Sequence, residues 1–291
     1  MGLLASCTGR SALPAVLAIT MAGVGSVALA AEEEKPPSLS DTAEFSYVLT
    51  AGNSETNTLG FKNAFVRNWE RASLTVRAGA VRTETTTTTR VAEGTPSDFR
   101  IVETSTTATT GNYFLNGQHD RKVTERFLWY MGAGWQRNRP AGIKSRYVAT
   151  AGVGNVWVDR AKVKFKTDYG LTYTKENDLV RNPSISGSFL GARLAWDYWH
   201  KFGENTTYGS VLILDDNLDH ASDYRADFTN WLAVSMNKRL ALKVSLQWLY
   251  DNKPALRTLA LVDATGAVIG TVLDEFDDLD TIFTASLVLN F

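Results

Sequence analysis

The chain has 291 residues, with 30 lysine and arginine residues against 31 aspartate and glutamate residues. This near-neutral balance gives no reason to expect a nucleic-acid partner, because proteins that bind the phosphate backbone are strongly basic. A transmembrane helix takes roughly 20 apolar residues, and the only comparable run lies at the N-terminus. The composition therefore excludes a protein built from several membrane-spanning helices.

The first 30 residues have the pattern of a secretory signal peptide. Arg10 supplies a positive charge before the apolar segment 13–29, and Ala28 and Ala30 satisfy the small-x-small cleavage rule. No basic stop-transfer cluster follows, which argues against the alternative of a transmembrane anchor. We therefore expect cleavage after residue 30 and a short periplasmic segment over residues 31–42.

Residues 43–291 repeat a two-residue alternation of apolar and polar side chains, the period of a strand with two different faces. The run 239–251 is the clearest example. Runs of ten or more residues exceed the usual soluble strand and match the 9–11 residues of a tilted membrane strand. Aromatic residues gather at many run ends, as at a membrane–water boundary: Trp69, Trp129, Trp135, Trp157, Trp196, Tyr198, Trp248, Tyr250 and Phe291. The pattern predicts an all-β fold, a transmembrane antiparallel up-and-down β-barrel, with a soluble β-domain as the alternative.

The alternating runs predict about twelve strands, an even number as in single-chain bacterial barrels. They are 43–51, 57–69, 72–83, 100–117, 126–137, 144–158, 161–175, 185–200, 205–215, 223–237, 239–251 and 279–291. Short connections alternate with longer ones, which predicts short periplasmic turns, longer outer loops and two periplasmic termini. The long segment 252–278 contains its own turn signal at 263–266 and is interpreted as an extra hairpin above the membrane. Counting its arms as spanning strands would give fourteen.

The stretch 44–58, EFSYVLTAGNSETNT, resembles the opening strand and Gly-Asn-rich turn of the YdiY-like family, described as salt-induced outer-membrane proteins. The last strand is similar to the C-terminal signal by which barrel-assembly machinery recognises its clients. The residues that match this signal are Phe283, Leu287, Leu289 and Phe291. The resemblance implies an outer-membrane barrel and carries no catalytic residue.

The faces opposite the apolar rows are expected to line the lumen, because a charge facing lipid costs roughly 2–4 kcal/mol at the bilayer midplane. The residues predicted to line it are Lys62, Arg77, Lys162, Lys164, Lys166, Asp168, Arg193, Arg225, Asp227 and Lys243. With Glu44 and Asp197 this set is basic overall, which predicts either a narrow path favouring anions or charges that pair and close the lumen. Twelve strands lie between small closed barrels and wide porins, so the strand number does not decide.

Two acidic outer segments suggest a cation site at the rim. Asp215, Asn217 and Asp219 match the first three ligand positions of a calcium loop, but the loop glycine and the bidentate glutamate are missing. The candidate ligands are Asp215, Asp216, Asn217, Asp219, Asp277 and Asp278. A solvated loop edge is the alternative, so no metal site is assigned with these ligands.

Three functions follow from this pattern. The first is a narrow passive channel with a basic lumen; the second is a non-channel envelope-integrity or surface-interaction protein linked to osmotic or salt stress. The third, an outer-membrane hydrolase, is disfavoured because His119, His200 and His220 are spread along the chain, so we expect no enzyme. We expect no cofactor; cleavage would also remove Cys7, the single cysteine. The expected partners are outer-membrane lipid and lipopolysaccharide, barrel-assembly machinery and small anionic solutes, with no nucleic acid.

Overall fold

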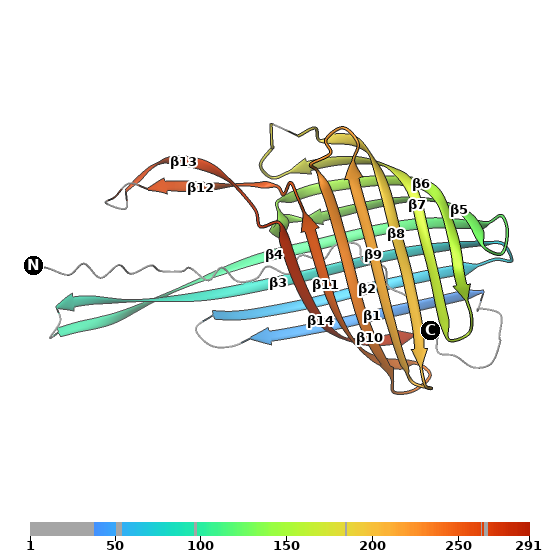
Figure 1. The fold of residues 1–291 in the computed structure, drawn as a ribbon. Helices are drawn as coiled ribbons and strands as arrows, with labels where there is room; N and C mark the ends of the chain where they lie inside the picture. Colours follow the sequence, from blue (N-terminus) through green and yellow to red (C-terminus); the bar gives the residue numbers. More distant parts are fainter. Residues whose placement is uncertain (1–37, 51–53, 96–97, 184, 263, 265–266) are drawn as a thin grey trace, which may run out of the picture.

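A computed structural model of the chain describes residues 38–291, except 51–53, 96–97, 184, 263 and 265–266. The predicted signal peptide, Cys7 and most of the predicted periplasmic segment lie outside the described residues. Twelve strands form one closed barrel (Figure 1). They are β1 (Leu39–Thr50), β2 (Ser54–Asn68), β3 (Ala72–Thr95), β4 (Asp98–Lys122), β5 (Phe127–Asn138), β6 (Ile143–Asp159), β7 (Val163–Asp178), β8 (Ser188–Phe202), β9 (Thr206–Asn217), β10 (Tyr224–Ser235), β11 (Leu240–Asp251) and β14 (Leu279–Asn290).

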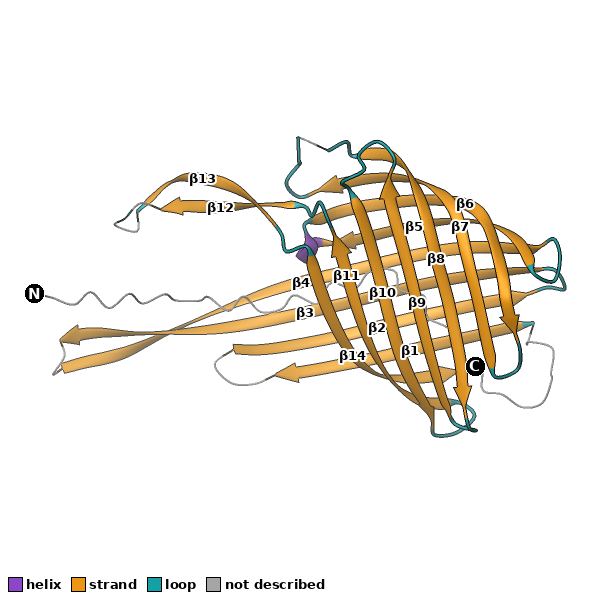
Figure 2. Cartoon of the chain, viewed as in Figure 1, coloured by secondary structure: helices purple, strands orange, loops and turns teal. Residues whose placement is uncertain are grey.

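Consecutive strands pair antiparallel around the barrel, and β14 closes it by pairing with both β11 and β1. β12 (Leu256–Val262) and β13 (Val268–Glu275) form a separate two-stranded sheet, and the only described helix is the short 3-10 turn η1 (Arg139–Ala141) (Figure 2). The up-and-down topology, the twelve barrel strands and the extra hairpin are therefore confirmed, and a fourteen-stranded barrel is wrong.

The two ends of the barrel differ in their connections. The turns at 69–71, 123–126, 160–162, 203–205 and 236–239 share one end, which we call the turn end. Phe291 exchanges backbone hydrogen bonds with Asp41 there, so the C-terminus lies at the turn end (Figure 1). The opposite end, the loop end, carries η1, the connections 179–187 and 218–223, and the β12–β13 hairpin.

The hairpin of β3 and β4 is longer than the runs 72–83 and 100–117 predicted. The register of β4 with β5 ends at Asn112 and Asn138, whereas β3 and β4 stay paired out to Thr95 and Asp98. The extra arms therefore project beyond the loop end (Figure 1). They are rich in threonine, which has high β-propensity, and Thr86 and Thr107 share a 2.8 Å hydroxyl hydrogen bond across them.

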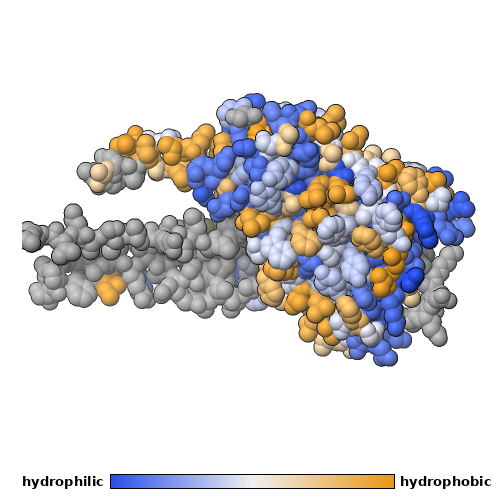
Figure 3. All heavy atoms as spheres, viewed as in Figure 1, coloured by the Kyte–Doolittle hydropathy of each residue, from blue (hydrophilic) through white to orange (hydrophobic). Residues whose placement is uncertain are grey.

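The outward face of the barrel is apolar. Large hydrophobic side chains on outward positions are strongly exposed, among them Leu171 (62%) on β7, Leu190 (56%) on β8 and Leu242 (54%) on β11. Figure 3 shows apolar side chains spread over the barrel wall, with hydrophilic ones among them. Within the described residues, no helix is long and apolar enough to cross a membrane.

Aromatic side chains form two rows on this outward face. The row near the turn end contains Trp69, Phe127, Trp157 and Phe202, and the row near the loop end contains Tyr113, Tyr147, Tyr173 and Tyr224. On β6 the two rows are ten residues apart, at Tyr147 and Trp157. At about 3.3 Å per residue and a tilt of about 45°, that separation is close to the roughly 25 Å apolar band of outer-membrane barrels.

Candidate functional site

The candidate site is the inside of the barrel, because the inward positions carry most of the charged groups. Most of the residues predicted to line the lumen occupy inward positions: Lys62 on β2, Arg77 on β3, Lys164, Lys166 and Asp168 on β7, Arg193 on β8, Arg225 and Asp227 on β10 and Lys243 on β11. Lys162 does not, because β7 begins only at Val163 and Lys162 lies exposed in the turn before it.

Two indole rings are buried inside the barrel toward the turn end. Trp199 on β8 and Trp231 on β10 both stand opposite Gly209 on the strand between them. They are 8% and 3% exposed and belong to one buried cluster. The missing side chain of Gly209 makes room for Trp231, because a Cβ there would lie 2.1 Å from Trp231 Cε2. The low exposure of both rings shows that they are covered by other side chains in this part of the barrel.

Lysine side chains lie against both indoles. The Nζ of Lys243 is 5.1 Å from the ring centroid of Trp231, and that of Lys164 is 5.9 Å from Trp199, within the range of cation–π attraction. Lys243 also donates a 2.7 Å hydrogen bond to Glu44 Oε1, with both side chains under 8% exposed. Lys62 stands directly opposite Glu44 on the neighbouring strand. Glu44 is thus the carboxylate that compensates a buried lysine next to the Trp199–Trp231 block.

A cavity of about 520 Å³ occupies the loop end of the lumen. Its wall is formed by inward residues of β5 to β11, and Pro140, Pro254 and Phe276 from the loop-end connections help to enclose it. The lining includes nine carboxylate residues and four arginines. The cavity is therefore acidic overall.

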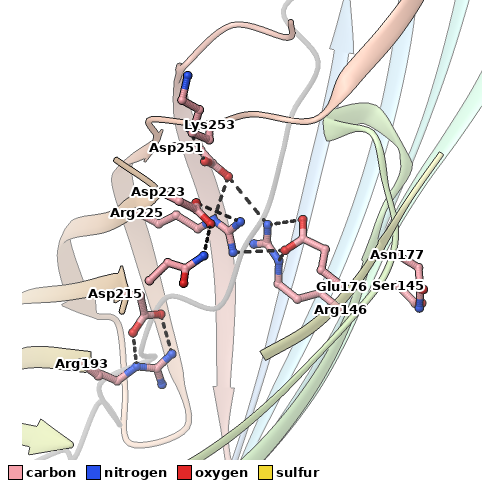
Figure 4. Close-up of polar contacts among 11 residues, drawn as sticks. Ser145, Arg146, Glu176, Asn177, Arg193, Asp215, Asp223, Arg225, Asp251 and Lys253 are labelled. Carbon is pink, nitrogen blue, oxygen red and sulfur yellow. Dashed lines mark hydrogen bonds and ion pairs between the residues drawn. The ribbon is translucent and has the colours of Figure 1, made fainter. Parts of the chain in front are cut away.

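The arginines of the cavity are held in ion pairs (Figure 4). Arg146 donates two hydrogen bonds to Glu176, at 2.7 and 2.8 Å, and Arg193 donates two to Asp215, at 2.6 and 2.7 Å. Arg225 lies between Asp251 at 3.0 Å, Glu176 at 3.1 Å and Asp223 at 3.4 Å. Such bidentate pairs fix the planar guanidinium groups firmly, which gives the cavity rigid walls.

The sequence interpretation missed several of these groups, most of which are carboxylates. Arg146 follows a register shift between Ile143 and Ser145, which obscures the alternation of β6. Glu176 lies one residue beyond the predicted strand end. Asp251 could have been found, because it shares the face of Lys243 on β11. Together with Asp120 on β4, which lies 3.9 Å from Lys166, these carboxylates balance the inward lysines and arginines.

Five of the six predicted rim cation ligands border the loop-end cavity: Asp215, Asp216, Asn217, Asp277 and Asp278. Asp215 faces inward to Arg193, whereas Asp216 faces outward and is exposed. Asn217 is buried, and its side-chain amide holds the β9–β10 connection together. It donates a hydrogen bond to the Asp223 carboxylate and accepts one from the backbone N–H of Asp219. Asp277 and Asp278 belong to the segment before β14. Among the described residues, no three carboxylate, histidine or cysteine groups are arranged to hold a metal ion.

The histidines and the C-terminal signal residues lie outside the lumen. His119, expected in a turn, is on β4 between the rings of Trp69 and Trp129, and His200 is stacked on Phe202 with a centroid separation of 4.1 Å. His220 lies in the β9–β10 connection. Of the signal residues, Phe283, Leu287 and Phe291 are exposed on the outer face, and Leu289 is partly exposed.

Comparison with solved structures finds outer-membrane barrels. The NanC porin is 11% identical with a TM-score of 0.42, covering 86% of this chain and 98% of the porin. An anion-selective porin from Comamonas acidovorans is 11% identical with a TM-score of 0.38, covering 87% and 99%. A FadL homologue from Pseudomonas aeruginosa is 13% identical with a TM-score of 0.33, covering 82% and 68%. All three TM-scores are below 0.5, so no function is carried over from these proteins.

No curated protein of known function matches the chain. The sequence profile of one family matches residues 43–259, which is most of the predicted mature chain and begins at its first strand. That match is consistent with the resemblance seen in the stretch 44–58. The chain therefore belongs to the DUF481 family, whose members are described as proteins of unknown function.

Proposed function

We propose that this chain is a bacterial outer-membrane protein that binds a small solute in its loop-end cavity and has no wide aqueous channel. The burial of inward-facing Trp199 and Trp231 carries the proposal, because an open pore would leave them in contact with water. Together with Lys243 and Glu44 they close the barrel below the cavity. The acidic lining favours a cationic or neutral polar solute over the small anionic solutes that the sequence suggested.

The membrane assignment rests on the outward face. Exposed apolar side chains bounded by two aromatic rows match a barrel in a bilayer, with the turn end and both termini in the periplasm. Outer-membrane lipid and lipopolysaccharide would then contact this face. The exposed residues of β14 would be presented to barrel-assembly machinery during insertion.

Replacing Leu171 with arginine tests the membrane placement. This side chain lies inside the apolar band on β7, two residues from Tyr173 of the loop-end row, so a charge there is expected to reduce the free energy of folding into a bilayer by about 1–2 kcal/mol, between the cost at the midplane and the cost at the interface. The measurement is urea-dependent folding into phosphatidylcholine liposomes. Asn177→Arg, at an exposed outward position beyond the loop-end row, is the matched control and should change little. An equal effect of both substitutions would contradict a bilayer around Leu171.

A narrow passive channel is the second candidate. It is favoured by the nature of the block between the cavity and the turn end, which consists of strand side chains. The short η1 enters the barrel at the loop end, where Ala141 packs against the inward cluster of Val81, Phe114 and Ile282. Conductance of the refolded protein in a planar bilayer separates the two functions. We expect no unitary steps for the wild-type protein; steady single-channel currents would overturn the closed lumen and support the channel.

We also propose that the protein is not a hydrolase. His119 and His200 face outward among aromatic rings, and His220 belongs to a connection on the loop end. General base catalysis needs a histidine and its orienting carboxylate facing one substrate position, and these three lie on different elements. A role in salt or osmotic stress is compatible with a barrel that binds a solute and has no wide channel, and it stays part of this proposal.

A further inference from the structure

The wall of the barrel is incomplete between β1 and β14. These two strands are in register over only five residues, Thr42–Ser46 opposite Ser286–Asn290. Every other pair of neighbours in the barrel is in register over at least eleven residues. From Leu279 to Ala285, β14 is paired with β11 alone, and β1 is paired beyond Ser46 with β2 alone. The two strands diverge toward the loop end (Figure 1).

This unpaired edge, which we call the seam, lies within the apolar band. Phe291 marks the turn-end boundary of β14, and a tilted strand needs about ten residues to cross the hydrocarbon, so Phe283 and Ala285 lie inside the band. Unpaired backbone N–H and C=O groups are not tolerated against lipid chains, and occur at membrane depth only where they border protein or a water-filled cavity. The seam therefore requires a polar space or an occupant beside it.

The loop-end cavity reaches this edge. Its lining includes Asp280, which faces inward on β14, and also Leu279 and Thr281, which face outward on the same strand. The cavity thus borders the first three residues of the unpaired part of β14. Asp277 and Asp278, immediately before the strand, add carboxylates to this part of the lining. An ammonium group entering at the edge would meet these carboxylates first.

An apolar cluster stands behind the seam inside the barrel. Ile282 on β14 contacts Val81 on β3 and Phe114 on β4, and these side chains are 2%, 4% and 7% exposed. Leu249 of the cavity wall is packed against this cluster. This cluster is already packed and closes the inside of the wall there, whereas Phe45 and Tyr47 on β1 and Phe283 on β14 are 45%, 59% and 64% exposed beside the seam. Exposed apolar side chains and the acidic cavity thus both lie next to the open edge. The combination suits a molecule with an apolar chain and a positively charged head.

We propose that the β1–β14 seam is a lateral portal through which a single-chain cationic amphiphile reaches the loop-end cavity from the bilayer. Its ammonium head lies among the carboxylates of the cavity, and its chain lies along the seam against the exposed side chains of Phe45, Tyr47 and Phe283. The inference rests on the proposed binding cavity and adds the class of ligand and its route of entry. No bond is made or broken in this step.

Narrowing the seam with a covalent link at its first unpaired position tests the portal, because the link holds β1 and β14 together where they begin to diverge. The link joins Tyr47 and Ala285, the first unpaired outward positions of the two strands. They follow Phe45 and Leu287, the last outward positions that are in register. The test variant Tyr47→Cys/Ala285→Cys is oxidised, or joined with a short bis-maleimide if the thiols are too far apart. The matched control is Phe45→Cys/Leu287→Cys, which links positions that are already in register. Both are made in the mature chain, which carries no other cysteine if Cys7 is removed with the signal peptide.

Native mass spectrometry of each refolded protein, incubated in neutral detergent with dodecylamine, measures the bound fraction. We expect the linked test variant to bind dodecylamine at least about tenfold more weakly than wild type, and the linked control to bind as wild type. Reduction of the disulfide should restore binding. Equal binding by the linked test variant and wild type would overturn the portal.

Two further probes separate the inference from the proposed function. Dodecanoic acid has the chain without the cationic head, and butylamine has the head without the chain; both are expected to bind at least about tenfold more weakly than dodecylamine. Butylamine binding as well as dodecylamine would refute the amphiphile while leaving a polar binding cavity in place. Dodecanoic acid binding equally would refute the recognition of a positive head. If no probe binds, the inference falls, and the closed lumen is still decided independently by conductance.

Discussion

Replacing Trp199 and Trp231 together with alanine is expected to convert a non-conducting barrel into one that passes ions in discrete steps. The two buried indoles stand on either side of Gly209 and fill the lumen between the cavity and the turn end. Removing both leaves only alanine methyl groups and glycine along that row of three strands, so water can join the cavity to the periplasmic side. Planar-bilayer recordings of the refolded variant measure this directly.

The control variant removes the same kind of side chain from the outer face of the barrel instead of the lumen. Trp69 and Trp157 are 45% and 56% exposed on the outer surface, so Trp69→Ala/Trp157→Ala removes as much indole without touching the lumen. Its recordings should stay silent. Heat-dependent migration in gels verifies that both variants form barrels. Silence of a folded Trp199→Ala/Trp231→Ala protein would show that the indoles are not the block.

Replacing Glu44 with glutamine is expected to cost about 3–5 kcal/mol of unfolding free energy, the usual penalty for removing one partner of a buried ion pair. Lys243 would lose its 2.7 Å partner while remaining buried, and Lys62, opposite Glu44, would lose the nearby negative charge. Urea titration of the barrel in detergent micelles, followed by tryptophan fluorescence, measures the change.

The double variant Glu44→Gln/Lys243→Met tests whether the effect comes from this pair. Removing both charges takes away the uncompensated lysine, so the double variant should lose less stability than the sum of the single variants. Glu84→Gln is a matched control, because Glu84 pairs with Arg82 in a solvent-exposed arm and such pairs contribute little. Strict additivity of the two buried substitutions would contradict the proposed coupling.

The position of individual residues shows how far the lumen could be predicted. Period-2 alternation placed Lys243, Arg193 and Arg225 on inward positions, because side chains of a strand alternate strictly between its faces. The same rule fails where the register shifts: Arg146 follows an irregularity of β6 and was missed. Lys162 was assigned to a strand that begins one residue later, so it lies in a turn.

The ion pairs and the cavity could not be predicted in the same way. Arg225 is close to Glu176, which comes from a strand on the other side of β8 and β9. Which inward side chains meet depends on how far each strand is shifted along its neighbour around the whole barrel. No short stretch of sequence specifies that shift. The same reason made the lumen look basic: the lysines stand out in clear alternating runs, whereas their carboxylate partners lie at strand ends and after irregularities.

Local sequence patterns predicted the fold class, the twelve barrel strands, the separate β12–β13 hairpin and the inward or outward direction of side chains along each regular strand. These properties follow from local periodicity and from turn residues, which act within a few positions along the chain. The burial of Trp199 and Trp231 beside Gly209, the acidic lining of the cavity and the short register of β14 with β1 became evident only in the folded barrel. Those features join strands far apart in the sequence, and their geometry is fixed only when the barrel closes.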